Sequence, residues 1–245
     1  MYKRLLVENS PSARFKKFHS ADQQVSKKKD IARHFEIIAK DYDKFKSMNW
    51  YYHETIKNFL KSSIPPGKKV LELGSGTGDI LAGLSPTVGL GIDISKEMVA
   101  LSKKKYPKLH FAQGTVENFR LKQKFDFVVM VDVIEHLYNH KQAFTNLKKQ
   151  IGKTPFIMTM DNPAWETIMM ISEKLGLKMP EGDHVRLSRK DVVRLYQETG
   201  FILYETGNLL ILPKFVPGIS PFVNRTYHTV PFVKTWGLID YFKST

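Results

Sequence analysis

The stretch from Val70 to Asp93, VLELGSGTGDILAGLSPTVGLGID, constrains the fold of this chain more than any other feature. A short apolar run ends at Leu73, glycines follow at alternate positions from Gly74 to Gly78, and a helical pattern begins directly after them. Glycines let the chain turn tightly and let a ligand approach the backbone, and a helix start offers free N–H groups. The stretch therefore predicts a nucleotide-binding strand–loop–helix–strand unit, and a plain strand–helix turn is the alternative.

Apolar runs and helical patterns alternate on both sides of this unit. The run 125–131 is almost continuously apolar, as expected for a strand buried on both faces. This alternation predicts an α/β fold: a doubly wound, Rossmann-like, mostly parallel sheet with helices on both faces. The expected strands are 70–73, 88–92, 109–112, 125–131, 156–160, 201–204 and 236–242. The expected helices are 31–39, 50–60, 78–84, 95–105, 140–150, 165–175 and 188–199.

Two classes of nucleotide cofactor suit a glycine loop followed by an acid at the end of the next strand. Asp93 is placed to accept hydrogen bonds from a ribose diol in either class. A dinucleotide fingerprint, G-x-G-x-x-G, requires glycine at position 79, where this chain has Asp79. Anionic Glu72 and Asp79 would also repel a diphosphate, so they favour a cofactor that carries an amino group and a sulfonium.

The string E-L-G-S-G-T-G, with Asp93 downstream, resembles the class I S-adenosylmethionine-dependent methyltransferases over residues 31–205. HFEIIAKDYDKF, Ile94–Met98 and VDVIEHL are similar to the small-metabolite branch that includes the quinone-biosynthesis methyltransferases. NWYYH and the C-terminal patterns resemble members that accompany glycosyltransferases. The resemblance implies S-adenosyl-L-methionine as cofactor and S-adenosyl-L-homocysteine as product.

The resemblance also implies which residues hold this cofactor. Those expected around its methionine part and its sulfur are Tyr42, Glu72, Gly74, Ser75, Gly76, Gly78, Asp132 and Val133. Those expected around its ribose and adenine are Asp93, Ile94, Met98, Thr115, Val116 and Glu117. The residues alone leave three alternatives open: Met98 as a core side chain, Tyr42 as packing between helices, and Asp132 as a helix N-cap.

Methyl transfer to a hydroxyl also requires an acceptor for its proton, and histidine is the usual agent near neutral pH. His136 lies just past the fourth expected strand, at the edge where open α/β sheets bind ligands. His184 lies in the irregular region after the fifth expected strand, so both histidines are candidate catalytic residues, and catalysis by proximity alone is the alternative. The chain has no cysteines and no clustered ligand spacing, so we expect no metal site.

The resemblance and the patterning together divide the chain into an arm and one domain. Residues 1–30 are predicted to form a flexible basic arm, and residues 31–245 a single class I methyltransferase domain. Within that domain, residues 31–64 are expected to form a helical cap. The apolar insertions 161–187 and 207–234 are expected to lie beside the methyl acceptor, the second as a lid.

The formal net charge of +14 indicates which partners the protein could attract: a basic surface can bind nucleic acid, anionic lipid or an acidic metabolite. The basic arm has little aromatic interleaving, so the sequence disfavours nucleic acid and leaves peripheral contact with an anionic membrane open. The absence of a long apolar run predicts a cytoplasmic protein. We expect methyl transfer to a small, lipid-like or glycan-linked metabolite. An RNA or protein methyltransferase, and a cofactor-binding module without catalysis, are the alternatives; the oligomeric state is left open.

Overall fold

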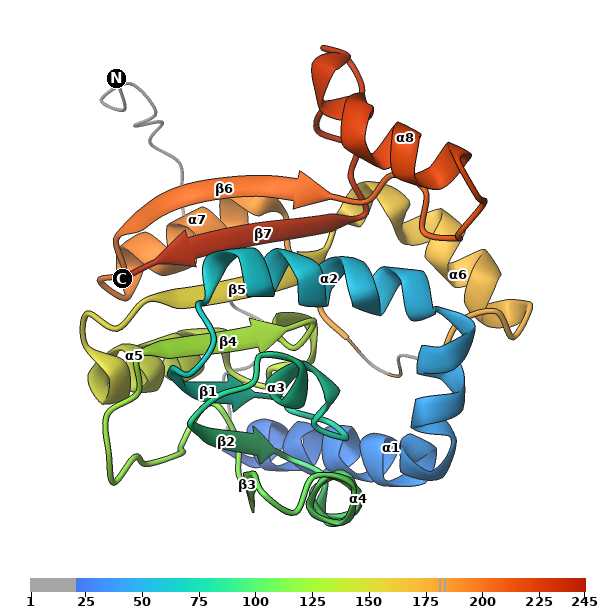
Figure 1. Ribbon diagram of the computed structural model, residues 1–245. Helices are drawn as coiled ribbons and strands as arrows, with labels where there is room; N and C mark the ends of the chain where they lie inside the picture. The colour runs from blue at the N-terminus through green and yellow to red at the C-terminus, as the bar shows by residue number, and fades with distance from the viewer. Residues whose placement is uncertain (1–20, 181, 183) are drawn as a thin grey trace.

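Seven strands form one mixed sheet in the computed structural model, which describes residues 21–180, 182 and 184–245 (Figure 1). The order across the sheet is β3-β2-β1-β4-β5-β7-β6. The first five strands pair in parallel, and β7 lies antiparallel between β5 and β6. The predicted α/β Rossmann-like class is therefore confirmed. The strands are β1 (Lys69–Leu73), β2 (Val88–Asp93), β3 (His110–Gln113), β4 (Phe127–Val131), β5 (Phe156–Asp161), β6 (Leu203–Leu209) and β7 (Ile239–Ser244).

In the described part of the chain, eight α-helices connect and cover these strands, and short 3-10 turns occur at Ile134–His136, Pro163–Trp165 and Tyr227–Thr229. The chain order of the sheet reverses between β1 and β4, which is the switch point where open α/β sheets bind ligands. The α-helices are α1 (Ala21–Met48), α2 (Trp50–Ser63), α3 (Asp79–Gly83), α4 (Lys96–Lys105), α5 (His140–Ile151), α6 (Glu166–Lys174), α7 (Arg189–Glu198) and α8 (Ile219–Thr226).

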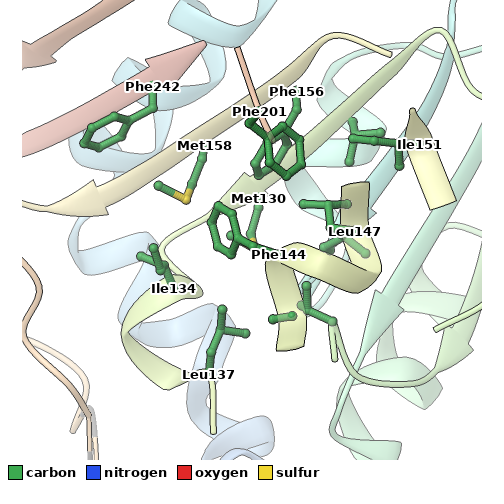
Figure 2. Close-up of a cluster of buried hydrophobic side chains, with 14 of the residues drawn as sticks. Met130, Ile134, Leu137, Phe144, Leu147, Ile151, Phe156, Met158, Phe201 and Phe242 are labelled. Atoms are coloured by element: carbon green, nitrogen blue, oxygen red, sulfur yellow. The ribbon is translucent and has the colours of Figure 1, made fainter. Parts of the chain in front are cut away.

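Alternate side chains of the central strands β1, β4 and β5 enter two cores, one on each face of the sheet. Val128 and Met130 of β4 pack with Phe144 of α5 and Tyr196 of α7 in the first core, part of which Figure 2 shows. Val129 of the same strand packs in the second core, which α2, α3 and α4 cover. A parallel strand covered on both faces is apolar throughout, which explains the unbroken run that marks β4 in the sequence.

The first helix begins earlier than the sequence predicts. Residues 21–30, expected as part of the flexible arm, form the first turns of α1, so the predicted boundary at residue 31 is wrong. Their lysines and glutamines give no apolar periodicity, and the helix is buried mainly from Ile31 onward, through Ile38 and Ala39. Residues 1–20 of the predicted arm lie outside the described residues.

The region after β5 carries the two predicted insertions to one edge of the sheet. Figure 1 shows α6, α8 and the junction of α1 with α2 around the edge at which the parallel strands end. Between α6 and α8 the chain returns to the sheet through α7, which begins with the predicted cap: Ser188 and Asp191 form a reciprocal capping box. The last strand is β7 at 239–244, three residues later than its predicted start. The three residues before it, 236–238, contact the region before α6 instead, because the Trp236 carbonyl accepts a hydrogen bond from the Trp165 indole.

Candidate functional site

The glycine loop between β1 and α3 adopts a left-handed backbone at each of its glycines, with φ of +72° at Gly74, +48° at Gly76 and +85° at Gly78. A Cβ at Gly74 would lie 2.1 Å from Val133, and one at Gly78 would lie 2.7 Å from the ring of Phe111. These two glycines are therefore needed for the packing of the loop against the protein itself. A Cβ at Gly76 would lie 3.2 Å from the Tyr42 ring, on the side of the loop that faces α1.

A cavity of about 820 Å³ opens above this loop, at the switch point of the sheet. Ligand sites typically span roughly 300–1,000 Å³. All but one of the predicted cofactor-binding residues line it: Tyr42, Glu72, Gly74, Ser75, Gly76, Asp93, Ile94, Met98, Thr115, Val116, Glu117, Asp132 and Val133. Gly78 is outside the lining, consistent with its packing against Phe111. The structure thus gathers around one cavity residues that the sequence separates by up to 91 positions.

Two buried acids fix the shape of the loop. The Asp93 carboxylate accepts hydrogen bonds from the Gly76 N–H at 2.8 Å and the Ser95 N–H at 2.9 Å. The Glu72 carboxylate accepts one from the Leu81 N–H at 3.1 Å, in the first turns of α3. Burial raises the pKa of both acids. Each carboxylate keeps acceptor capacity beyond these bonds, because a carboxylate offers about four lone-pair sites.

Tyr42 lies over the loop because an ion-pair network holds α1 against α3 and α4. Lys46 of α1 pairs with Asp43 at 2.8 Å and with Asp79, and Lys105 of α4 lies 2.7 Å from both acids. The charge of Asp79 is therefore compensated within the protein. This compensation removes the charge on which the predicted repulsion of a diphosphate by Asp79 depends. The raised pKa of buried Glu72 weakens the same argument at that residue.

The predicted adenine side of the cavity combines apolar walls with fixed polar groups. Met98 is buried and packs against Ile38 and Ala39 of α1, so it is both a core residue and part of the wall. The Glu117 carboxylate accepts a hydrogen bond from the Tyr138 N–H at 3.0 Å, and the Thr115 hydroxyl donates to the Asn118 side-chain oxygen at 2.8 Å. These hydrogen bonds fix the segment after β3 and the segment before α5 around the adenine end of the cavity.

The opposite end of the cavity holds a hydroxyl–carboxylate cluster whose residues come from α2, β5 and the segment after β4. Asp132, after β4, has a positive φ of +52°, and its carboxylate accepts hydrogen bonds from Tyr52 of α2 and Thr159 of β5, both at 2.8 Å. The Tyr52 hydroxyl also lies 3.2 Å from the carboxylate of Asp161, at the end of β5. Asp132 is not a helix N-cap, because Val133 takes that position and makes no side-chain cap bond.

Burial, together with the negative charge of Asp161, raises the pKa of Asp132 to about 7. The hydrogen bonds from Tyr52 and Thr159 act in the opposite direction, because they stabilise the ionised carboxylate. Asp132 therefore exchanges its proton near neutral pH. A group with that property at the wall of a cavity is suited to accept a proton from a bound molecule.

The two predicted catalytic histidines occupy different places. His136 lines the cavity, and its ring meets the ring of Phe35 edge-on at 5.0 Å between centroids. The ring of His184 lies 6.2 Å from that of His136, outside the cavity lining, and its Nδ1 lies 2.9 Å from the Gly182 carbonyl. The geometry favours His136 over His184 for direct contact with a bound molecule.

Several cavity residues were missed by the sequence reasoning, chiefly Tyr52, Asp161 and Lys178. Lys178 lies 3.3 Å from the Asp161 carboxylate and links it to α6 by a contact with Met169. Asp161 could have been found by the rule that selected His136, since it lies at the carboxyl end of a parallel strand. Within residues 21–180, 182 and 184–245, no group of three His, Asp or Glu side chains could hold a metal ion.

Comparison with known proteins places this site in a family. A model of the methyltransferase domain family matches residues 70–151, which run from β1 to α5. An uncharacterized protein of Methanocaldococcus jannaschii is 30% identical over 169 residues, covering 68% of this chain and 80% of that protein. A demethylmenaquinone methyltransferase of Chlorobaculum tepidum is 40% identical over 52 residues, which are 20% of this chain and 22% of that enzyme.

Solved structures of methyltransferases share the fold of this chain. A SAM-dependent methyltransferase of Thermotoga maritima superposes with a TM-score of 0.68 at 19% identity, covering 88% of this chain and 99% of its own. Magnesium protoporphyrin IX methyltransferase of Synechocystis, solved with bound S-adenosylhomocysteine, superposes with a TM-score of 0.62 at 15% identity, covering 87% and 97%. The sequence match, the glycine loop and the shared fold lead to one conclusion: the chain belongs to the class I S-adenosylmethionine-dependent methyltransferases.

Proposed function

We propose that this methyltransferase acts on a small or lipid-like metabolite, including one linked to a glycan, and methylates an oxygen or carbon atom of it. The observation that carries this proposal is the hydroxyl–carboxylate cluster of Tyr52, Asp132 and Asp161 at one end of the cavity. Met169 of α6 lies at that end, since its sulfur is 3.3 Å from the Lys178 amine that pairs with Asp161, and Trp165, just before α6, also lines the cavity. Such a site suits a compact acceptor with apolar surface.

The residues of the loop suit S-adenosylmethionine. The Ser75 hydroxyl is buried at the cavity wall and makes no hydrogen bond within the described part of the chain, so a polar ligand group can satisfy it. Gly76 leaves the backbone open beneath Tyr42. In this arrangement Glu72 and Ser75 would hold the methionine part, Asp93 the ribose hydroxyls, and Met98 with Val116 the adenine.

The cofactor and the protein would make different contributions to methyl transfer. When bound, S-adenosylmethionine supplies a methyl group activated by its sulfonium. The protein aligns the acceptor atom with that methyl group and excludes water from the cavity, and positioning of this kind can lower a barrier by several kcal/mol. Tyr52 and Thr159 hold the Asp132 carboxylate in one orientation, and the ionised carboxylate accepts the proton of the acceptor. His136, on the same wall, is the second candidate for this role.

The relatives support an acceptor of this class. The match to a demethylmenaquinone methyltransferase and a match to a ubiquinone biosynthesis O-methyltransferase of Dictyostelium discoideum are both to proteins named for quinone chemistry. Quinone precursors combine a ring hydroxyl or ring carbon with an apolar tail. The apolar wall of α6 and the polar cluster behind it fit those two parts.

A panel of acceptors tests the proposal. Methyl transfer from labelled cofactor should be fastest to phenols that carry an apolar tail, slower to the same phenols without a tail, and absent with short RNA or peptides. A higher kcat/KM with RNA or with peptides than with any phenol would overturn the assignment of the acceptor class.

Replacing Asp93 by alanine should weaken S-adenosylmethionine binding by roughly 5- to 150-fold, equivalent to about 1–3 kcal/mol, because charge-assisted hydrogen bonds to the ribose are lost. The loss of the bond to the Gly76 N–H adds to this effect. Isothermal titration calorimetry measures it directly. Asp126→Ala is the matched control, because Asp126 also accepts a backbone hydrogen bond, from Lys69, but lies outside the cavity lining. Unchanged affinity in Asp93→Ala would remove the ribose role.

Replacing His136 by alanine should lower kcat by about 10-fold or more while the dissociation constant of S-adenosylmethionine changes less than threefold, if its ring contacts the acceptor. Single-turnover rates and calorimetry separate the two quantities. His110→Ala, at the exposed start of β3, is the control. Full turnover in His136→Ala would reject this histidine and leave Asp132 as the proton acceptor.

A further inference from the structure

The rim of the cavity carries large apolar side chains that point into solvent. On α6 and just after it, Ile168, Ile171 and Leu175 are exposed, the last at 67%. On α8 and the segment that follows, Phe222 is 68% and Phe232 is 87% exposed. Single exposed apolar residues are ordinary on soluble proteins, but a group of them around a cavity marks an interaction surface. We call this group, together with Ile219 of α8, the rim surface.

Contacts connect the segments that carry the rim surface. The Trp165 indole donates a hydrogen bond of 2.7 Å to the Trp236 carbonyl, which joins the turn before α6 to the segment that follows the lid. The ring of Phe215 lies 5.2 Å from that of Trp50, which joins the lid to the start of α2. Figure 1 shows α6 and α8 beyond the same edge of the sheet.

All formally charged side chains of the lid, residues 207–234, are positive. From Thr206 to Ile239 the sequence contains no aspartate or glutamate, and it contains Lys214, Arg225 and Lys234. Arg225 and Lys234 are exposed, next to the apolar residues of the rim surface. The lid, residues 207–234, thus combines exposed apolar side chains with cations and lacks acids, which makes it complementary to an anionic lipid bilayer. The neighbouring α6 does carry two acids, Glu173 and Glu166, and the second pairs with Arg186 at 2.8 Å.

The rim surface is also continuous with the cavity. Ile168 and Leu177 are both exposed and part of the cavity lining, and Pro213 and Lys214 of the lid line the same opening. A molecule lying against the rim surface would thus meet an apolar path toward the Asp132 cluster. No helix within the described residues is long and apolar enough to cross a bilayer, so any contact made by this part of the chain is peripheral.

We propose that the rim surface docks on anionic lipid bilayers and that the methyl acceptor enters the cavity directly from the bilayer. The second half of this statement rests on the proposed function. A symmetric dimer through the same surface is disfavoured, because it would place the cationic, acid-free lid against its own copy. The cations of residues 1–20 would add to the attraction, but the apolar contact is assigned to the lid and α6.

Co-sedimentation of the full chain with vesicles tests the docking. Binding to phosphatidylcholine vesicles containing 30% phosphatidylglycerol should exceed binding to pure phosphatidylcholine by at least tenfold and should fall as salt is raised. The double variant Phe222→Ser/Phe232→Ser should bind the anionic vesicles at least tenfold more weakly. Arg225→Gln/Lys234→Gln should also weaken binding, since each cation near an anionic surface contributes about fivefold.

The matched control is Ile202→Ser/Tyr204→Ser, which removes two exposed apolar side chains from the start of β6, away from the cavity. This variant should bind vesicles as the wild type does, and all variants should bind S-adenosylmethionine normally, which shows that they are folded. Equal vesicle binding by the wild type and the Phe222/Phe232 variant would overturn the proposal. So would a wild-type dimer in light scattering that this variant abolishes. Vesicle binding requires no methyl transfer, so its failure is distinct from a failure of the proposed function.

Discussion

Gly76→Val should reduce S-adenosylmethionine affinity by at least 100-fold while leaving a folded protein. Valine at φ +48° is strained, and its Cβ would lie 3.2 Å from the Tyr42 ring, between the loop and α1. The branched methyl groups must extend past that Cβ, either into the cavity or against Tyr42. Calorimetry gives the affinity, and circular dichroism with thermal melting verifies the fold.

Gly152→Val separates steric blocking from backbone strain. Gly152, after α5, has a similar φ of +62°, and a Cβ there meets no atom within 4 Å. Both variants place valine at a positive φ that side chains other than glycine rarely adopt, so both should lose stability, but only Gly76→Val should lose cofactor binding. Affinity within threefold of the wild type in Gly76→Val would contradict the assignment of this loop to the cofactor.

Asp132→Asn should lower kcat by about 10²- to 10³-fold, the range typical for loss of a positioned proton acceptor, with cofactor affinity changed less than threefold. The wild-type kcat should rise with pH through about 7, because only the ionised carboxylate accepts a proton. The variant should lose this rise. Stopped-time methyl-transfer assays from pH 5.5 to 8.5 provide both results. A variant that keeps the wild-type rate, or the same pH step, would exclude Asp132 as the proton acceptor.

The raised pKa of Asp132 also affects the stability of the fold, which should fall with rising pH while kcat rises. The pKa of this carboxyl group is raised from 3.8 to about 7 in the folded protein, so between these values the folded state binds a proton that the unfolded chain has lost. This contribution to stability is fully present below the lower value and is lost as pH rises through about 7. Asp132→Asn should therefore show a smaller fall in melting temperature between pH 5 and pH 8 than the wild type. An equal fall in both proteins would show that Asp132 ionises normally.

The parts of the fold that depend on local pattern were predictable. β4 is apolar at every position because both faces of the sheet are covered, and α7 begins where Ser188 and Asp191 form a capping box. The glycine loop was recognisable because left-handed turns restrict the residue type. The beginning of α1 was not predictable, because residues 21–30 lack an apolar stripe.

The parts of the site that depend on distant contacts were not predictable. The hydroxyl of Tyr52 meets Asp132 and Asp161 across 80 and 109 residues, and only the packing of α2 against the ends of β4 and β5 brings them together. The compensation of Asp79 by Lys46 likewise depends on how α1 crosses the loop. Such pairs carry no local sequence signal.

The most direct test of the central claim uses S-adenosylmethionine labelled in its methyl group, incubated with the protein and a fractionated extract of the cell that encodes it. The account predicts that label appears in the organic-soluble or small-molecule fraction, and that Gly76→Val abolishes it. Label confined to RNA or protein, or no label above that of Gly76→Val, would contradict it.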